Sequence, residues 1–255
     1  MSQPERASLS VRGVEEPDQP PLRTHRECSV WAASSTSSVE SYSDHGQQEK
    51  VIVTGFEPFG EHAVNASWVA VQELDRIGLG EDIDLFVCEV PVEYQAVQTL
   101  LPSLWAEHQP RVVSGPRGSL RSGQAVTLEQ CGHNKGYRRL DNCCFSPESE
   151  CCIEDGPECI GSVLDMDLVC KRVSEAGVGT KVTVSKDAGR YLCDYTYYTS
   201  LFVGNGRAAF IHVPPLGKPY SSEELGRALQ TVIAEMLRQL EGENAQAHCN
   251  HQGHH

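Results

Sequence analysis

A strand pattern, a turn and the start of a helix follow one another in Val182-Thr-Val-Ser-Lys-Asp-Ala-Gly189-Arg-Tyr191-Leu-Cys193. The β-branched run at 182–185 predicts a buried strand, Gly189 supplies a turn, and the residues from Tyr191 onward lack strand alternation and can begin a helix. Cys193 would then lie near a helix N-terminus, where unpaired N–H groups and the helix dipole favour a thiolate. The stretch therefore predicts a nucleophilic sulfur at a strand–helix junction.

A histidine ends the next apolar run, Ala208-Ala-Phe-Ile-His212-Val-Pro-Pro215. The two prolines stop a strand at this point, so His212 is expected at its end. Ligands of open α/β sheets collect at the carboxyl ends of strands, and we therefore expect Cys193 and His212 to be neighbours in space. A Cys–His pair of this kind suits nucleophilic catalysis.

Strand and helix patterns alternate between residues 50 and 241, which predicts one α/β domain. We expect a three-layer α/β/α sandwich around a twisted, mostly parallel sheet. The last helix has the clearest signal, because Ser221-Ser-Glu-Glu224 is a capping box that precedes an apolar stripe. Strand patterns occupy 51–54, 85–90, 182–185 and 208–213, and helix patterns occupy 68–74, 92–105, 166–173 and 221–240.

The two ends of the chain lack periodic apolar patterns. Residues 1–48 are rich in Ser, Pro, Glu and Gln, which predicts a disordered N-terminal tail. We expect residues 242–255 to form a flexible C-terminal tail, whose histidines can bind stray metal.

Composition excludes several classes of function. The formal net charge is −14 and no basic stripe offsets it, so nucleic-acid binding is not expected. No signal-peptide pattern and no apolar stretch of about 20 residues occurs, which predicts a soluble, cytoplasmic protein without a membrane span. The 11 cysteines should then be mostly reduced, and they predict no disulfide framework.

A run of cysteines leaves a metal-binding module as an alternative. Adjacent cysteines with wider gaps between them do not match the C-x2-C spacing of structural zinc sites. We therefore expect incidental thiols and no metal or cofactor. The run comprises Cys143, Cys144, Cys151, Cys152 and Cys159.

Five separated fragments, in the right order, resemble the pyroglutamyl-peptidase I family of mammals. The resemblance covers most of residues 50–241, which makes it more specific than any one motif. The fragments are Thr54-Gly-Phe-Glu-Pro-Phe-Gly60, Val64-Asn-Ala-Ser-Trp68, Val126-Thr-Leu-Glu-Gln-Cys-Gly-His-Asn-Lys-Gly-Tyr137, Asp187-Ala-Gly-Arg-Tyr-Leu-Cys193 and His212-Val-Pro-Pro-Leu-Gly-Lys218.

The resemblance implies a cysteine exopeptidase, an omega peptidase that removes N-terminal pyroglutamate from small peptides. It matches Cys193 to the nucleophile, His212 to the general base and Glu129 to the acid that orients the imidazole. Phe56 and Phe59 match the aromatic residues of the lactam pocket. No metal or cofactor is implied, and a monomer is the simplest expectation.

Two groups are candidates for stabilising the oxyanion. The backbone N–H of Cys193 is one of them. Arg138 or Arg139, downstream of Glu129, is the other.

The chain departs from the family in an N-terminal extension and at residues 114–124. The family has an apolar strand and a substrate-side loop where this chain has Ser114-Gly-Pro-Arg-Gly-Ser-Leu-Arg-Ser-Gly-Gln124. Glycines and a proline continue a central strand poorly, so the strand begun at Val113 is expected to be cut short. A catalytically inactive or unstable isoform is therefore the alternative to an active enzyme.

Overall fold

The computed structural model describes residues 48–59, 64–110, 112–118 and 124–251. Their centre is a six-stranded sheet with the order β2-β1-β3-β8-β4-β7. Four neighbouring pairs of these strands are parallel and the β4–β8 pair is antiparallel. The strands are β1 (Glu49–Phe56), β2 (Ile83–Val90), β3 (Val112–Gly118), β4 (Val126–Glu129), β7 (Val182–Ser185) and β8 (Ala208–Val213).

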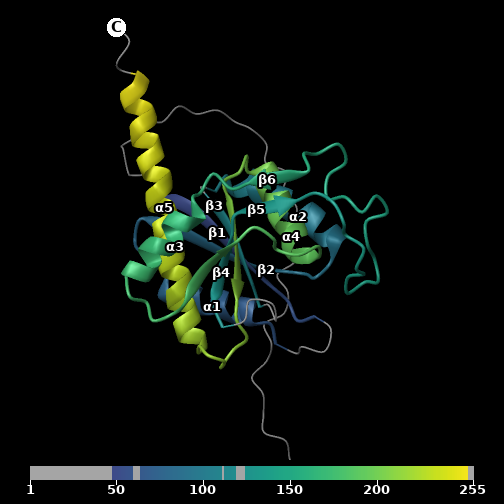
Figure 1. The fold of residues 1–255 in the computed structure, drawn as a ribbon, viewed down its shortest axis with the longest axis horizontal. Coiled ribbons are helices and arrows are strands. Elements are labelled where there is room, and N and C mark those ends of the chain that lie inside the picture. The colour runs from purple at the N-terminus through teal and green to yellow at the C-terminus, as the bar shows by residue number, and fades with distance from the viewer. Residues whose placement is uncertain (1–47, 60–63, 111, 119–123, 252–255) are drawn as a thin grey trace, which may run out of the picture. The chain divides into compact units, whose positions relative to one another are not determined.

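Helices cover both faces of the sheet, which confirms the three-layer α/β/α fold. One apolar cluster joins one face to α1, α3 and α5, and a second cluster joins the opposite face to α2 and α4 (Figure 1). The helices are α1 (Ala66–Ile77), α2 (Tyr94–His108), α3 (Met166–Glu175), α4 (Leu192–Val203) and α5 (Ser222–His251).

Local sequence signals explain where these elements begin. Every residue of β8 is buried, as expected for an apolar strand that is covered on both faces. Asn65 caps α1 by accepting a hydrogen bond from the Ser67 N–H at 3.1 Å. The capping box of α5 is also present, because Glu224 N–H donates to Ser221 Oγ at 3.2 Å and Ser221 N–H donates to Glu224 Oε2 at 2.7 Å.

The expectation that the strand after Val113 is cut short is wrong. The backbone of β3 runs on to Gly118 and pairs in parallel with β8 from Val113 to Gly118. The pairing of β3 with β1 ends at Ser114, so at Pro116 the strand pairs with β8 alone. A strand with one neighbour tolerates the missing N–H of a proline more easily than a strand with two. Residues 119–123 of the altered segment lie outside the described residues.

The ends of the domain differ from the sequence prediction in one respect. Helix α5 continues through Gly242 to His251, where a flexible tail was expected to begin at residue 242. A single glycine costs a helix only about 1 kcal/mol, and no proline follows it to force an end. The predicted N-terminal tail at 1–47 lies outside the described residues, as do residues 252–255. Within the described residues, none of the helices is long and apolar enough to span a membrane.

A small antiparallel sheet lies beside α4. It consists of β5 (Cys131–His133) and β6 (Cys159–Gly161). A Cβ atom at Gly132 would lie 3.0 Å from both the Cα and the backbone N of Tyr198 in α4, so a larger residue would push the two backbones apart. The segment that follows Glu129 is therefore seated directly on helix α4.

Candidate active site

A cysteine, a histidine and a glutamate form a hydrogen-bonded chain of side chains. Cys193 Sγ lies 3.3 Å from His212 Nε2, and His212 Nδ1 lies 2.9 Å from Glu129 Oε1. Cys193 is the second residue of α4, His212 is near the end of β8, and Glu129 is the last residue of β4. The structure thus brings together the three residues predicted for catalysis.

Glu129 and His212 meet because β4 and β8 are antiparallel neighbours. Glu129 pairs with Phe210, so His212 is two residues further along the adjacent strand. Side chains at such diagonal positions share a face of the sheet and are about 7–8 Å apart, which a glutamate side chain can span.

Cys193 and His212 are neighbours as expected, but the expected reason is wrong. Strand β7 is parallel to β4 and therefore runs opposite to β8, so the two strands do not share a carboxyl edge. Instead, α4 lies against β8, and the chain reverses between them at residues 204–207. From this turn, Cys193 lies about 15 Å back along α4, given the rise per residue of a helix. His212 lies about 13 Å from the turn along β8, given the rise per residue of a strand, so the two residues are at similar distances from the turn and lie side by side.

Burial and charge favour the protonated form of the His212 imidazole. His212 is 7% exposed and Glu129 is 1% exposed. Burial lowers the pKa of His212, but attraction and hydrogen bonding to the Cys193 thiolate, followed by those to Glu129, outweigh it and raise the pKa to about 9. An imidazolium at neutral pH can stabilise the thiolate and later deliver a proton.

The start of α4 leaves backbone donors near Cys193. Tyr191 is the N-cap residue and makes no side-chain capping hydrogen bond. The first amides of a helix have no carbonyl partner one turn earlier, so they point outward as donors. The Cys193 N–H therefore remains the backbone candidate for an oxyanion contact.

The two arginine candidates occupy different environments. Arg138 Nε donates to Glu150 Oε2 at 2.7 Å, which ties it into an ion pair at the surface. The Arg139 guanidinium lies 4.4 Å from the centre of the Tyr191 ring, beside the start of α4. This position favours Arg139 over Arg138 as a group near the reacting atoms.

The two predicted pocket phenylalanines differ in exposure. Phe56 is fully buried in the apolar cluster beneath α2 and α4. Phe59 is half-buried and packs at the margin of the same cluster, as Cys193 does. Phe59 thus has surface available for a ligand, whereas Phe56 supports the wall from within.

A buried carboxylate next to Cys193 was missed by sequence reasoning. Asp194 accepts hydrogen bonds from the His133 N–H at 3.2 Å, the Tyr137 hydroxyl at 3.2 Å and Arg190 at 3.3 Å. Burial raises its pKa to about 7, although Arg190 and the hydrogen bonds oppose this. The only local signal for Asp194 was that it is an acidic residue in the first turn of a predicted helix. Asp194 anchors the start of α4, and hence Cys193, to the segment at 133–137.

Among the described residues, one group of side chains could hold a metal ion. It comprises Cys131, His133 and Cys159, which belong to β5 and β6. The other four cysteines of the sequence run do not belong to this group, and among them Cys152 is buried beside Thr199. They are Cys143, Cys144, Cys151 and Cys152.

The His212 pKa can be tested directly. In Cys193→Ala, we expect the pKa of His212 to fall from about 9 by about one to three units, because the thiolate that contributes most to raising it is gone. NMR titration of the imidazole signals measures this shift. Cys170→Ala removes a half-buried thiol from α3 and should leave the His212 pKa unchanged. If the pKa of His212 were the same in Cys193→Ala as in Cys170→Ala, the result would contradict an ion pair between the Cys193 thiolate and the His212 imidazolium.

Comparison with known proteins agrees with this geometry. A family model described as pyroglutamyl peptidase matches residues 49–234. Pyroglutamyl-peptidase 1 of Rattus norvegicus is 60% identical over 205 residues, which make up 80% of this chain and 98% of the rat protein. Pyroglutamyl-peptidase 1 of Homo sapiens is 61% identical over 194 residues, covering 76% of this chain and 92% of the human protein.

The fold is also found in a solved structure. Pyrrolidone carboxyl peptidase from Thermococcus litoralis superposes with a TM-score of 0.70 at 24% identity, covering 77% of this chain and 96% of that chain. At this identity the likeness supports the fold alone, whereas the family model and the mammalian sequences cover nearly the whole domain. The chain therefore belongs to the pyroglutamyl peptidase family.

Proposed function

We propose that this protein is a cysteine peptidase that hydrolyses the N-terminal pyroglutamyl group from peptides, with Cys193, His212 and Glu129 as its catalytic residues. The observation that carries the proposal is the continuous chain from Cys193 Sγ through both nitrogens of His212 to Glu129 Oε1, with links of 3.3 and 2.9 Å. Family membership supplies the substrate class.

The first half of the reaction forms an acyl-enzyme. The Cys193 thiolate attacks the pyroglutamyl carbonyl carbon, and the carbonyl oxygen takes up the electron pair as an oxyanion. The tetrahedral intermediate collapses when His212 donates its Nε2 proton to the departing amine. The C–N bond breaks, and the pyroglutamyl group remains on sulfur as a thioester.

Water completes the reaction through the same imidazole. His212, now neutral, accepts a proton from water as the oxygen attacks the thioester. Collapse of the second intermediate releases pyroglutamate and regenerates the thiolate. Glu129 holds the ring through Nδ1 and offsets the imidazolium charge each time it forms.

The oxyanion needs a hydrogen-bond donor that stabilises its negative charge better than bulk water does. We assign this role to the Cys193 N–H in the first turn of α4, where the helix dipole also favours negative charge. Arg139 adds positive charge beside it through its position on the Tyr191 ring.

A neutral lactam ring suits an aromatic wall. Pyroglutamate lacks the charged α-amine of other N-terminal residues, so it can enter an apolar site at little cost in desolvation. Phe59 would contact the ring, and the buried Phe56 would hold that wall in place.

An inactive or unstable isoform is the less favoured reading. Strand β3 pairs with its neighbours in spite of its altered sequence, and the register places Arg117 beside His212. The three catalytic side chains remain in contact. Both observations support an active site that tolerates the changes at 114–118.

The cellular location, the substrates and the oligomeric state of the enzyme can also be proposed. We propose action in the cytoplasm, where reducing conditions keep thiols such as that of Cys193 free of disulfide bonds. We propose small peptides as substrates and a monomer as the working form, because all three catalytic residues come from one chain.

Selective cleavage of a fluorogenic arylamide tests the proposal. Under reducing conditions, the protein should release aminomethylcoumarin from the pyroglutamyl derivative at least about 10²-fold faster than from the prolyl derivative, because burying an unpaired ammonium group costs several kcal/mol. The prolyl compound is a matched control with a similar ring and a charged amine. Absence of selective turnover by folded protein would instead support the inactive isoform.

A further inference from the structure

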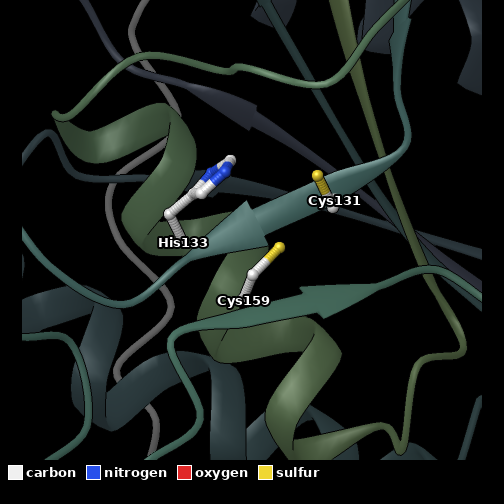
Figure 2. A group of neighbouring side chains, drawn as sticks. All are labelled: Cys131, His133 and Cys159. Carbon is white, nitrogen blue, oxygen red and sulfur yellow. The ribbon is translucent and has the colours of Figure 1, made fainter.

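Three side chains of types that bind metals converge on one face of the β5–β6 sheet, and none of them belongs to the proposed catalytic triad. Cys131 and His133 are two residues apart on β5, so they project from the same face of the strand. Cys159 of β6 pairs directly with His133 across the sheet. Figure 2 shows the two sulfur atoms and the imidazole gathered beside this hairpin, and one ligand atom from each residue lies within 4.8 Å of the others.

The spacing is close to that of a bound metal ion. Zinc bonds of about 2.0–2.3 Å imply ligand atoms about 3.3–3.8 Å apart in a tetrahedron. The observed limit of 4.8 Å exceeds this by only about 1 Å, which small side-chain rotations can supply. Cys159 is exposed and the other two residues are half-buried, so an ion can reach the site.

A carboxylate lies behind the imidazole of His133. His133 Nδ1 is buried without a hydrogen-bond partner and lies 3.6 Å from Asp194 Oδ1. Histidines that bind metals present one ring nitrogen to the ion and direct the other toward a carboxylate. Asp194 can take the Nδ1–H, which leaves Nε2 of His133 for the metal. Arg190 is the nearby cation, and its charge is already matched by Asp187 at 2.7 Å and Asp194 at 3.3 Å.

We propose that Cys131, His133 and Cys159 bind a zinc ion, with solvent as the fourth ligand. Two thiolates and one imidazole form a donor set that zinc prefers over magnesium or calcium. Both thiols lose their protons to solvent on binding, so the two thiolates balance the charge of the ion. The fourth position stays open, because the three side chains come from one side of the hairpin.

The ion would link the two ends of a long connecting segment, which we call the β5–β6 excursion. This segment, residues 134–158, leaves β5 and returns to β6, and it contains both Tyr137 and Arg139. A link between Cys131 or His133 and Cys159 joins the two ends of this excursion. Zinc binding should therefore stabilise the folded protein and raise its melting temperature.

Cobalt provides a spectroscopic test in the full-length Cys193→Ala protein, in which the active-site sulfur cannot bind the ion. We expect Co²⁺ to produce a thiolate-to-cobalt charge-transfer band that one equivalent of Zn²⁺ abolishes. Adding Cys159→Ser should remove the band and the zinc-dependent rise in melting temperature. Adding Cys143→Ser, which removes another exposed thiol, should preserve both. His133→Asn keeps both thiols and should weaken zinc binding by at least about 10-fold.

Comparison of these variants excludes other sources of binding. The His-rich C-terminus is present in all of them, so metal held there would bind equally to the Cys159 and Cys143 variants. Equal binding to those two variants, or cobalt binding without a charge-transfer band, would overturn the proposal. None of these measurements depends on peptidase activity.

Discussion

Replacing Cys193 by alanine is expected to lower kcat by at least about 10⁴-fold, because it removes the thiol that lies 3.3 Å from His212 Nε2. The imidazole and the backbone donors remain, but no covalent intermediate can form. Release of aminomethylcoumarin from its pyroglutamyl derivative measures the loss.

The matched control is Cys170→Ala. Cys170 is also a half-buried thiol, but it belongs to α3 on the opposite face of the sheet. This variant should retain the activity of the parent protein. Turnover by Cys193→Ala at more than a few per cent of the parent rate would contradict the role of Cys193 as the nucleophile.

Replacing Glu129 by glutamine is expected to lower kcat by about 10² to 10⁴-fold. Glutamine keeps the size of the side chain but removes the negative charge beside His212 Nδ1, so the imidazolium is less stable and its tautomer is no longer fixed. Because ring orientation and proton transfer are affected, the loss should appear in kcat more than in KM.

Glu235→Gln is the matched control for the Glu129 variant. Glu235 is also a buried carboxylate, but it pairs with Arg172 and Arg238 on the far side of the sheet. It should leave kcat unchanged even where it lowers stability. Equal kcat values for the two glutamine variants would show that Glu129 is only a structural acid.

Local patterns in the sequence were sufficient for the layers and for two of the proposed catalytic residues. The strand, turn and helix signals around Cys193 and His212 depend on nearby residues, and they are confirmed. Glu129 was reached only through the family resemblance. Its role requires β4 to lie antiparallel to β8, and strand direction is decided by long-range packing that no local pattern reveals.

The remaining differences have the same physical origin. Pro116 disfavours a central strand locally, yet backbone pairing with β8 overrides that preference. Asp194 resembles an ordinary acid in the first turn of a helix until the fold buries it against Tyr137 and Arg190. Cys159 was grouped with its sequence neighbours, whereas strand pairing places it opposite His133.

The contact at Gly132 helps to hold the proposed catalytic residues Glu129 and Cys193 in place before a substrate binds. Because β5 packs closely on the backbone of α4, the strand that follows Glu129 is in contact with the helix that carries Cys193. The entropy of aligning acid and nucleophile is therefore lost once, during folding, and not again in each turnover. Substrate selection can then depend on how well a peptide fits groups that folding has already aligned.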